Sequence, residues 1–479
     1  MKILYVGSEV IPFISTGGLG DVLGSLPAAI AKNSAENDVR VVMPYFKSIK
    51  EKFGPQLTFV GETVVHLSWR NQYCGVYSYE KDGVTYYFID NEYYFNRATI
   101  YGDYDDGERY SFFSKAALDI MPLVDFYPDI MHCNDWQSAM SIVYLKRKYA
   151  QNTKYAGIKT IYTIHNIDYQ GIYGMEILDD VFGLDTWGDR GIMEYNNCIN
   201  LTKGALVCTD IISTVSQRYA NEIQTEFYSA GLHHVLHMYS SKLTGIVNGI
   251  DVNYYNPAND NVIAKKYSSS DVSGKSVCKK ELQELAGLPV NPDIPVVSMV
   301  SRLASHKGFD LVKYILPEII DLGIQFVLLG TGEADIEEYF RDIQARYPDQ
   351  VKVFFEFNKD LSKKIYAGSD IFLMPSKSEP CGLSQMIASR YGTVPVVRET
   401  GGLYDTIKPY NKFTGEGNGF TFANYNAHEM KDAVKRAVEL YFDKKKWNTL
   451  VKTVMDVDFS WNVSAEKYMD LYKNVSKEY

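Results

Sequence analysis

The order of apolar and amphipathic segments predicts an α/β protein with two doubly wound domains. Short apolar runs alternate with longer amphipathic ones along both halves of the chain, which is typical of parallel strands joined by right-handed helical crossovers. The length, 479 residues, exceeds what one hydrophobic core usually holds. The turn signal Asn248-Gly249, followed by a polar stretch, separates the two halves. We therefore expect domains at 1–245 and 246–457.

Each half supplies five apolar segments with the length of buried strands. In the first half these are 2–7, 39–43, 129–132, 159–164 and 211–215, and in the second half 295–300, 325–329, 351–355, 370–374 and 394–397. An insertion at about 57–90 alternates apolar and polar residues, which predicts antiparallel hairpins. Residues 458–479 predict a final helix, with Ser460 as its candidate N-cap.

The composition argues against several classes of protein. Hydrophobic residues make up 46% and charged residues 23%, which is ordinary for a globular protein, and the net charge of −10 argues against a nucleic-acid surface. Six scattered cysteines without a CxxC pair indicate a reduced, cytoplasmic enzyme. No apolar run reaches the roughly 18 residues that a membrane span needs. The 38 tyrosines fit either carbohydrate contact, where aromatic faces stack on sugars, or compositional drift.

In the first half, polar motifs follow three predicted strands. Gly17 and Gly18 come after the first strand and lead into a helix. Glycine lets a ligand come close to the backbone, and the amides at a helix start can bind an anion. The loop matches neither a Walker motif nor a dinucleotide fingerprint. Asp135 and His165 follow the strands at 129–132 and 159–164. Because the carboxyl ends of parallel strands share one sheet edge, we expect both residues at the same edge of one sheet, although a lone strand-end histidine is more often structural.

In the second half, two basic residues follow the end of one predicted strand. Arg302 and Lys307 are five residues apart and stand beside a helix start. A planar arginine fork with a lysine point charge suits a diphosphate, and the alternative is a solvated loop. Gly332, after the next strand, is a candidate nucleotide contact, and residues 400–402 add a second glycine pair at another strand end.

The most informative stretch places Glu379 in a tight strand-to-helix turn. An apolar segment at 370–374 precedes it and a helical pattern at 383–390 follows it. Glu379 and the backbone amides of residues 381–383 are therefore expected at the carboxyl end of a strand, where open α/β sheets bind ligands. The alternative is an ordinary loop in which Glu379 serves only as a capping charge.

A metal site is not expected from the histidines. His233 and His237 could share one face of a helix, with His234 beside them, but the HEXXH pattern is absent and no carboxylate is placed to help.

Together these motifs resemble those of bacterial glycogen synthases and plant starch synthases, in order and over essentially the whole chain. The motifs that carry the resemblance are Thr16-Gly17-Gly18-Leu19-Gly20-Asp21-Val22, Asn134-Asp135-Trp136, Thr163-Ile164-His165-Asn166, Asn248-Gly249-Ile250-Asp251, Ser301-Arg302-Leu303 with Lys307-Gly308, Pro375-Ser376 with Glu379-Pro380-Cys381-Gly382-Leu383, Thr400-Gly401-Gly402-Leu403 and Asp458-Phe459-Ser460-Trp461. The resemblance implies the GT-B fold, with two Rossmann-like domains facing across a deep cleft and a C-terminal helix at 458–479 that crosses back to the first domain.

The resemblance further implies a retaining glucosyltransferase. Such an enzyme moves glucose from a nucleotide-sugar donor, usually ADP-glucose, to the non-reducing 4-hydroxyl of an α-1,4-glucan, which is glycogen, starch or a maltooligosaccharide. The first domain would serve the acceptor and the second the donor. No cofactor and no metal are implied, because Arg302 and Lys307 can supply the positive charge. Neither a nucleic acid nor a membrane is an expected partner.

Residue roles carry over to the matching positions. The resemblance places the catalytic Arg302 and Lys307 on the donor phosphates, Glu379 beside the donor sugar, and His165 beneath it. The implied substrate-binding residues are Ser15, Gly17, Gly18, Asp21, Asp135, Asn248, Gly332, Cys381, Gly382, Leu383, Thr400, Gly401 and Gly402. Asp135 and Asn248 would hold glucose hydroxyls, and the amides of residues 382–383 and 400–402 would complete an anion site.

Two positions depart from the family pattern. Ser15 stands where the family usually has a lysine associated with the donor, and His306 stands where the bacterial proteins usually have glutamine. Loss of the lysine removes a cation, which leaves UDP-glucose open as the donor. The remaining alternative is a glucan-binding homologue without turnover, but the four catalytic residues all persist.

Overall fold

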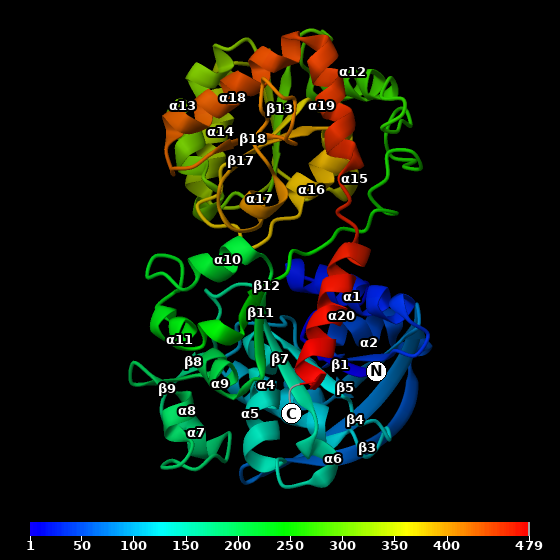
Figure 1. Cartoon of the computed structure of the whole chain (residues 1–479), viewed down its shortest axis with the longest axis vertical. Helices are drawn as coiled ribbons and strands as arrows, with labels where there is room; N and C mark the ends of the chain where they lie inside the picture. The colour runs from blue at the N-terminus through cyan, green and yellow to red at the C-terminus, as the bar shows by residue number, and fades with distance from the viewer. Residues whose placement is uncertain (478–479) are drawn as a thin grey trace. The chain divides into compact units, whose positions relative to one another are not determined.

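The computed structural model describes residues 1–477, which form two α/β units that are each built on a wholly or mostly parallel sheet (Figure 1). The first unit comprises Met1–Val215, Ala220–Ile246 and the chain from Trp461 onward. The second comprises Ser216–Tyr219 and Val247–Ser460. No helix within residues 1–477 is both long and apolar enough to cross a membrane.

The first unit contains a nine-stranded sheet in the order β12-β11-β7-β6-β1-β2-β5-β4-β3. Its strands are β1 (Lys2–Val6), β2 (Asp38–Pro44), β3 (Thr58–Leu67), β4 (Arg70–Lys81), β5 (Val84–Asp90), β6 (Ile130–Asn134), β7 (Lys159–Ile164), β11 (Ile211–Thr214) and β12 (Leu243–Gly245). Strand β4 pairs antiparallel with β3 and β5, and every other neighbouring pair is parallel. A small sheet, β8-β10-β9, is formed by β8 (Ile172–Tyr173), β9 (Glu194–Tyr195) and β10 (Cys198–Asn200).

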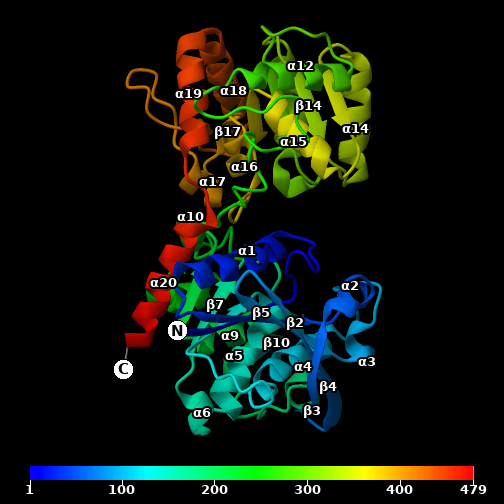
Figure 2. The same cartoon turned by 90° about the vertical axis from the view of Figure 1, so that its right-hand side faces the viewer.

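Helices of the first unit pack around this sheet. They are α1 (Gly18–Asn33), α2 (Lys47–Phe53), α3 (Glu92–Phe95), α4 (Asp106–Asp119), α5 (Trp136–Lys148), α6 (Thr153–Ala156), α7 (Ile177–Asp180), α8 (Arg190–Met193), α9 (Leu201–Cys208), α11 (His233–Met238), α20 (Trp461–Lys477) and the short turns η1 (Gly54–Gln56) and η2 (Ser240–Lys242). Helix α10 (Gln217–Glu222) lies where the chain passes between the units. The C-terminal α20 lies beside α1 in both views (Figures 1 and 2).

A buried chain of hydrogen bonds fastens α20 to the sheet. The Tyr472 hydroxyl lies 2.7 Å from the Tyr5 hydroxyl on β1 and 2.7 Å from His132 Nδ1 on β6. Burial lowers the pKa of His132 to about 3, so its ring is neutral at physiological pH. The final helix is therefore part of the first unit's core, although the whole second unit separates it from that unit in sequence.

The second unit contains a six-stranded sheet in the order β15-β14-β13-β16-β17-β18, with all neighbouring pairs parallel. The strands are β13 (Val296–Val300), β14 (Gln325–Leu329), β15 (Val351–Phe354), β16 (Ile371–Met374), β17 (Val394–Arg398) and β18 (Phe420–Phe422). The helices are α12 (Gly274–Ala286), η3 (Ser305–Lys307), α13 (Phe309–Ile320), α14 (Ala334–Arg346), α15 (Lys359–Gly368), α16 (Ser384–Arg390), α17 (Gly401–Thr406), α18 (Ala427–Phe442) and α19 (Lys444–Asp456).

All ten predicted parallel strands are present, with ends that shift by a residue or two. The predicted final helix is α20, and residues 478–479 of that prediction lie outside the described residues. The insertion at 57–90 forms the predicted antiparallel hairpins, and its last strand, β5, also pairs in parallel with β2, so the insertion extends the main sheet. Five short strands, β8, β9, β10, β12 and β18, were not predicted, because two or three residues carry too little periodicity to be recognised.

Candidate active site

The predicted site residues fall into two groups, one at the carboxyl-terminal strand ends of each sheet. In the first unit, the loop after β1 carries Glu9, whose buried carboxylate faces the glycine loop. It accepts hydrogen bonds from the Gly17 amide at 3.2 Å, the Thr16 hydroxyl at 2.9 Å and the Tyr101 hydroxyl at 2.7 Å, and also from the Thr16 amide. The Glu9 carboxylate thus accepts hydrogen bonds from the loop that the sequence predicts to bind an anion.

The glycine pair leaves open space at the start of α1. A Cβ atom built on Gly17 or Gly18 meets nothing within 4 Å, so packing does not demand glycine at either position. Ser15 is exposed, and its hydroxyl donates to the Gly17 carbonyl at 3.0 Å, so its proton is already committed. Asp21 lies in the first turn of α1, where a negative charge complements the helix dipole.

Asp135 and His165 lie together, as expected from their strand ends. The Asp135 carboxylate accepts the His165 main-chain N–H at 2.8 Å. Asp135 has a φ of +56° with a ψ of 177°, a backbone combination that costs a residue other than glycine about 1–3 kcal/mol. Burial raises the pKa of the Asp135 carboxyl to about 7, although hydrogen bonds from the amides of His165 and Asn166 oppose the rise. Burial lowers the pKa of His165 to about 3, so this unit offers a neutral imidazole beside a carboxyl that titrates near neutrality.

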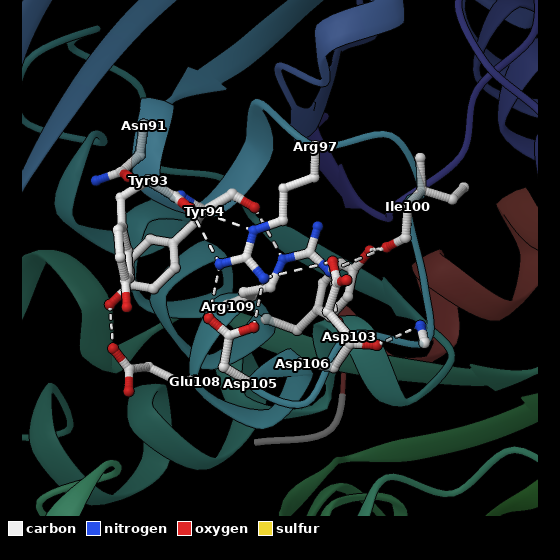
Figure 3. Close-up of polar contacts among 12 residues, drawn as sticks. Asn91, Tyr93, Tyr94, Arg97, Ile100, Asp103, Asp105, Asp106, Glu108 and Arg109 are labelled. Atoms are coloured by element: carbon white, nitrogen blue, oxygen red, sulfur yellow. Dashed lines mark hydrogen bonds and ion pairs between the residues drawn. The ribbon is translucent and has the colours of Figure 1, made fainter.

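The loop at 96–105 supplies Tyr101 and is held by a buried arginine (Figure 3). The Arg109 side chain is fully buried, donates to the Tyr94 carbonyl at 2.8 Å and pairs with Asp103 at 3.0 Å. It also pairs with Asp106 in the same helix. Glu9 and Tyr101 were not predicted as site residues, because no motif spacing links residues that only the folded loops bring together.

In the second unit, Lys307 and Glu379 form an ion pair with a distance of 2.7 Å between Nζ and Oε2. Lys307 ends the η3 turn after β13, and Glu379 follows β16. The Ser376 hydroxyl also donates to Glu379 at 3.0 Å, and the Glu379 side chain is only 9% exposed. Arg302 is exposed and forms no ion pair within residues 1–477. The positive charge most available at this edge is therefore that of Arg302, while Glu379 partly neutralises Lys307.

The glycines of the second unit serve close backbone packing. A Cβ on Gly401 would lie 1.9 Å from the Glu379 carbonyl, and one on Gly402 would lie 2.0 Å from the Cys381 carbonyl. The Gly402 amide already donates to the Glu379 and Pro380 carbonyls, each at 3.1 Å. The glycine pair thus lets the loop after β17 press against the loop that carries Glu379.

Two further backbone amides of the predicted site are also hydrogen-bonded within the second unit. The Thr400 amide donates to the Arg398 carbonyl at 2.9 Å, and the Gly332 amide donates to Glu337 at 3.1 Å. These amides and that of Gly402 are therefore committed in this conformation, because the short loops must satisfy their own backbone. Gly382 has φ +72°, so only glycine turns the chain there without strain before Leu383, which precedes α16.

Asn248 and Cys381 are buried members of the predicted site in the second unit. Asn248 is 6% exposed, and its side-chain oxygen is buried without a hydrogen-bond partner within residues 1–477. A buried acceptor left unpaired costs about 1–3 kcal/mol, which favours a ligand at this atom. Burial raises the pKa of the Cys381 thiol to about 12, so Cys381 contributes as a small neutral side chain.

No cluster of three or more His, Cys, Asp and Glu residues in the described part of the chain is arranged to hold a metal ion. His233 and His234 lie at the start of α11, with their ring centroids 4.1 Å apart.

Comparison with known proteins identifies the family. The family model described as starch synthase catalytic domain matches residues 2–238, and the model described as glycosyl transferases group 1 matches residues 283–452. The chain is 48% identical to a glycogen synthase of Anoxybacillus flavithermus, over 98% of this chain and 97% of that one. It is 47% identical to a glycogen synthase of Clostridium novyi, over 99% of both chains.

Solved structures show the same fold. The catalytic domain of starch synthase IV from Arabidopsis thaliana, bound to ADP and acarbose, matches with a TM-score of 0.89 and 32% identity over 99% of both chains. A sucrose-phosphate synthase from Thermosynechococcus elongatus shares the fold alone, with a TM-score of 0.62 and 15% identity over 99% of this chain and 98% of that one. The chain therefore belongs to the glycogen and starch synthase family of glucosyltransferases, which have the GT-B fold.

Proposed function

We propose that this enzyme transfers glucose from a nucleotide-glucose donor, preferably ADP-glucose, to the non-reducing 4-hydroxyl of an α-1,4-glucan with retention of configuration. The names of its relatives support glucan synthesis, and the related starch synthase IV was solved with ADP and acarbose. The observation that carries the proposal is the Lys307–Glu379 contact, because it joins a phosphate-binding cation to a carboxylate at the strand ends of one sheet.

The proposed donor site lies on the second unit. Arg302 and Lys307 stabilise the negative charge that develops on the diphosphate as the glycosidic bond breaks. Glu379 orients the Lys307 ammonium toward that position. Asn248 supplies its unpartnered oxygen to a donor hydroxyl. The leaving phosphate takes the proton of the acceptor hydroxyl on the same face of the sugar, which yields retention without a covalent enzyme intermediate.

The proposed acceptor domain, residues 1–245, contributes the residues around the reacting sugar. His165 is neutral, so its ring and main chain can lie beneath an oxocarbenium-like sugar without placing a positive charge against it. Asp135 orients the His165 backbone through its 2.8 Å hydrogen bond and accepts from a glucose hydroxyl. The open glycine pair at 17–18 leaves room for the donor phosphates at the start of α1.

Ser15 is the observation that favours UDP-glucose as the alternative donor. Its hydroxyl proton is donated to the Gly17 carbonyl, so Ser15 offers a phosphate neither a charge nor a ready donor. A charge-assisted hydrogen bond is roughly twice as strong as a neutral one. We therefore expect Ser15→Lys to lower the donor KM by a factor of about ten, for a contact worth about 1.4 kcal/mol.

The test is a donor comparison with glycogen as acceptor. Initial rates with ADP-glucose and UDP-glucose are measured for the wild-type enzyme and for Ser15→Lys. The matched charge control is Ser276→Lys, because Ser276 is also exposed and also donates its hydroxyl proton to a nearby carbonyl, that of Ser273. We expect nucleoside diphosphate release that depends on glycogen and a higher kcat/KM for ADP-glucose. A higher kcat/KM for UDP-glucose would reverse the donor assignment, and release of neither diphosphate would leave the glucan-binding alternative.

A further inference from the structure

Asn134, the last residue of β6, makes three side-chain contacts that together determine how its amide is oriented. It is 1% exposed. One end of the amide, Nδ2, lies 3.3 Å from the Val6 carbonyl and 3.2 Å from the His132 carbonyl. The other end, Oδ1, lies 2.9 Å from His165 Nε2.

Only one orientation of this amide satisfies all three contacts. Two carbonyl oxygens can only accept, so the end that faces Val6 and His132 must be the NH₂ group. A flipped amide would place oxygen against two oxygens in a buried site, which costs the full desolvation penalty of each unpaired group. The amide oxygen therefore points at His165, and an amide oxygen can only accept.

The protonation of His165 follows from this orientation. Nε2 must carry a proton in order to donate to the Asn134 oxygen. The ring is neutral because burial lowers its pKa to about 3, so only one nitrogen is protonated. Nδ1 accepts no hydrogen bond within residues 1–477, and His165 keeps partial exposure to solvent.

The groups around the ring do not reverse this assignment. The Asp135 carboxylate bonds the His165 main-chain N–H, and Glu9 is engaged with the glycine loop. His132, on the neighbouring strand, is itself neutral and bonds Tyr472 and Thr163. None of these side chains is hydrogen-bonded to the imidazole of His165.

We propose that Asn134 is a positioning residue that holds His165 as its Nε2–H tautomer, so that the unprotonated Nδ1 accepts a hydrogen bond from a hydroxyl of the sugar substrate. This inference rests on the proposed glucosyl transfer for the identity of the ligand. A neutral acceptor nitrogen repels phosphate oxygens and bonds hydroxyls, so the ring separates the sugar from the diphosphate. Asn134 exerts this selectivity without touching the substrate.

The first test reads the tautomer directly and needs no activity. Two-dimensional ¹H–¹⁵N spectra of histidine-labelled protein report the protonation of each ring nitrogen, and a His165→Gln variant assigns the signals. We expect Nε2 protonated and Nδ1 unprotonated in the substrate-free enzyme at neutral pH. A protonated Nδ1 would overturn the proposal, whether or not the enzyme makes glucan.

The second test changes Asn134. In Asn134→Asp, a carboxylate faces Nε2 and favours the imidazolium, so both ring nitrogens should become protonated and kcat should fall at least tenfold, with partial recovery at higher pH. Asn200→Asp is the matched control, because Asn200 is similarly buried and its side chain bonds Gln170 and the Lys203 amide. An Asn134→Asp enzyme that folds, keeps an unprotonated Nδ1 and loses no activity would refute the positioning role.

The third test identifies the hydroxyl. Donors that lack one glucose hydroxyl are compared in the wild-type enzyme and in His165→Ala. Removal of the hydroxyl that bonds Nδ1 should lower kcat/KM about tenfold in the wild type and should change it little further in His165→Ala. Equal losses in both enzymes for every hydroxyl would show that Nδ1 binds none of them. If no donor supports glucan synthesis at all, the proposed function fails while the tautomer result still stands.

Discussion

At the scale of single residues, Lys307 of the candidate donor site has two negatively charged partners that compete for its ammonium group. The lysine neutralises a mostly buried carboxylate in the resting protein, and in the proposed mechanism it must also neutralise a diphosphate. Arg302 is exposed and outside any ion pair within residues 1–477, so it neutralises no buried carboxylate in the resting protein. The two cations should therefore respond differently to removal, although the proposed mechanism uses both.

We expect Lys307→Ala and Arg302→Ala each to lower kcat by a factor on the order of 10²–10³, the scale of losing one preorganised electrostatic contact. Lys307→Ala should also destabilise the protein by roughly 2–3 kcal/mol, since it leaves Glu379 unpaired in a mostly buried site. Arg302→Ala should leave the thermal midpoint unchanged. Steady-state kinetics and thermal unfolding of both variants test this, and a change in KM alone would show uniform donor binding instead.

Asp135 makes a pH-dependent contribution to stability. Its pKa is about 7 in the folded protein and near its ordinary value of 3.8 when unfolded, so the folded state binds the extra proton. Stability from this group is fully present below about pH 4 and is lost as pH rises toward 7. The thermal midpoint of Asp135→Asn, which cannot ionise and has nearly the same shape, should therefore rise relative to the wild type between about pH 4 and 8. A constant difference across this range would contradict the raised pKa.

At the scale of elements, the two glycine pairs have opposite physical origins. Gly17 and Gly18 stand at the start of α1 with nothing for a Cβ to meet, whereas Gly401 and Gly402 begin α17 with carbonyl oxygens in the way. The motif alone predicts an anion-binding loop in both places, because Thr-Gly-Gly-Leu is the same in each. The tertiary contacts leave the first pair without a packing neighbour and use the second pair in loop packing.

A matched pair of substitutions tests this difference. Gly402→Ala places a methyl group 2.0 Å from the Cys381 carbonyl, so it should lower the thermal midpoint by several degrees and displace the loop that carries Glu379. Gly17→Ala meets no neighbour and should keep the wild-type stability while it raises the donor KM. The idea fails if Gly402→Ala is as stable as Gly17→Ala.

At the scale of the whole molecule, the proposed site residues belong to two units. His165 and Asp135 lie in the first unit, and Arg302, Lys307 and Glu379 lie in the second. The proposed reaction uses both sets, so it needs residues of both units at the substrates. We predict hinges near Asn248 and near Ser460, which are two of the places where the chain passes between the units.

We expect the radius of gyration, measured by small-angle X-ray scattering, to fall when ADP and a maltooligosaccharide are added together. Neither ligand alone should produce the full change, because the proposed transfer needs the donor and the acceptor together. The control is the Lys307→Ala variant, in which a weakened donor contact should reduce the change. An unchanged radius in a protein shown to be open without ligands would contradict closure.

The sequence by itself determined the ten parallel strands, because buried parallel strands need apolar runs and their alternation with helices indicates parallel pairing. It also determined that Asp135 and His165 meet, since neighbouring parallel strands end at one edge. The pairing of Lys307 with Glu379 could not be predicted in this way, because both residues fit a role toward the substrate and lie 72 positions apart. Hydrophobic periodicity predicts where a helix or strand lies in the sequence. It does not predict which loop residues contact one another.

Only the tertiary structure decided which polar atoms are already used. It showed that Glu9 holds the glycine loop, that the amides of Thr400 and Gly402 serve the protein's own carbonyls, and that the Ser15 proton is committed. It also set the neutral state of His165, because a pKa depends on desolvation by residues far away in the sequence. A sequence names the groups that can do chemistry, and the fold decides which of their hydrogen bonds and charges remain available to a substrate.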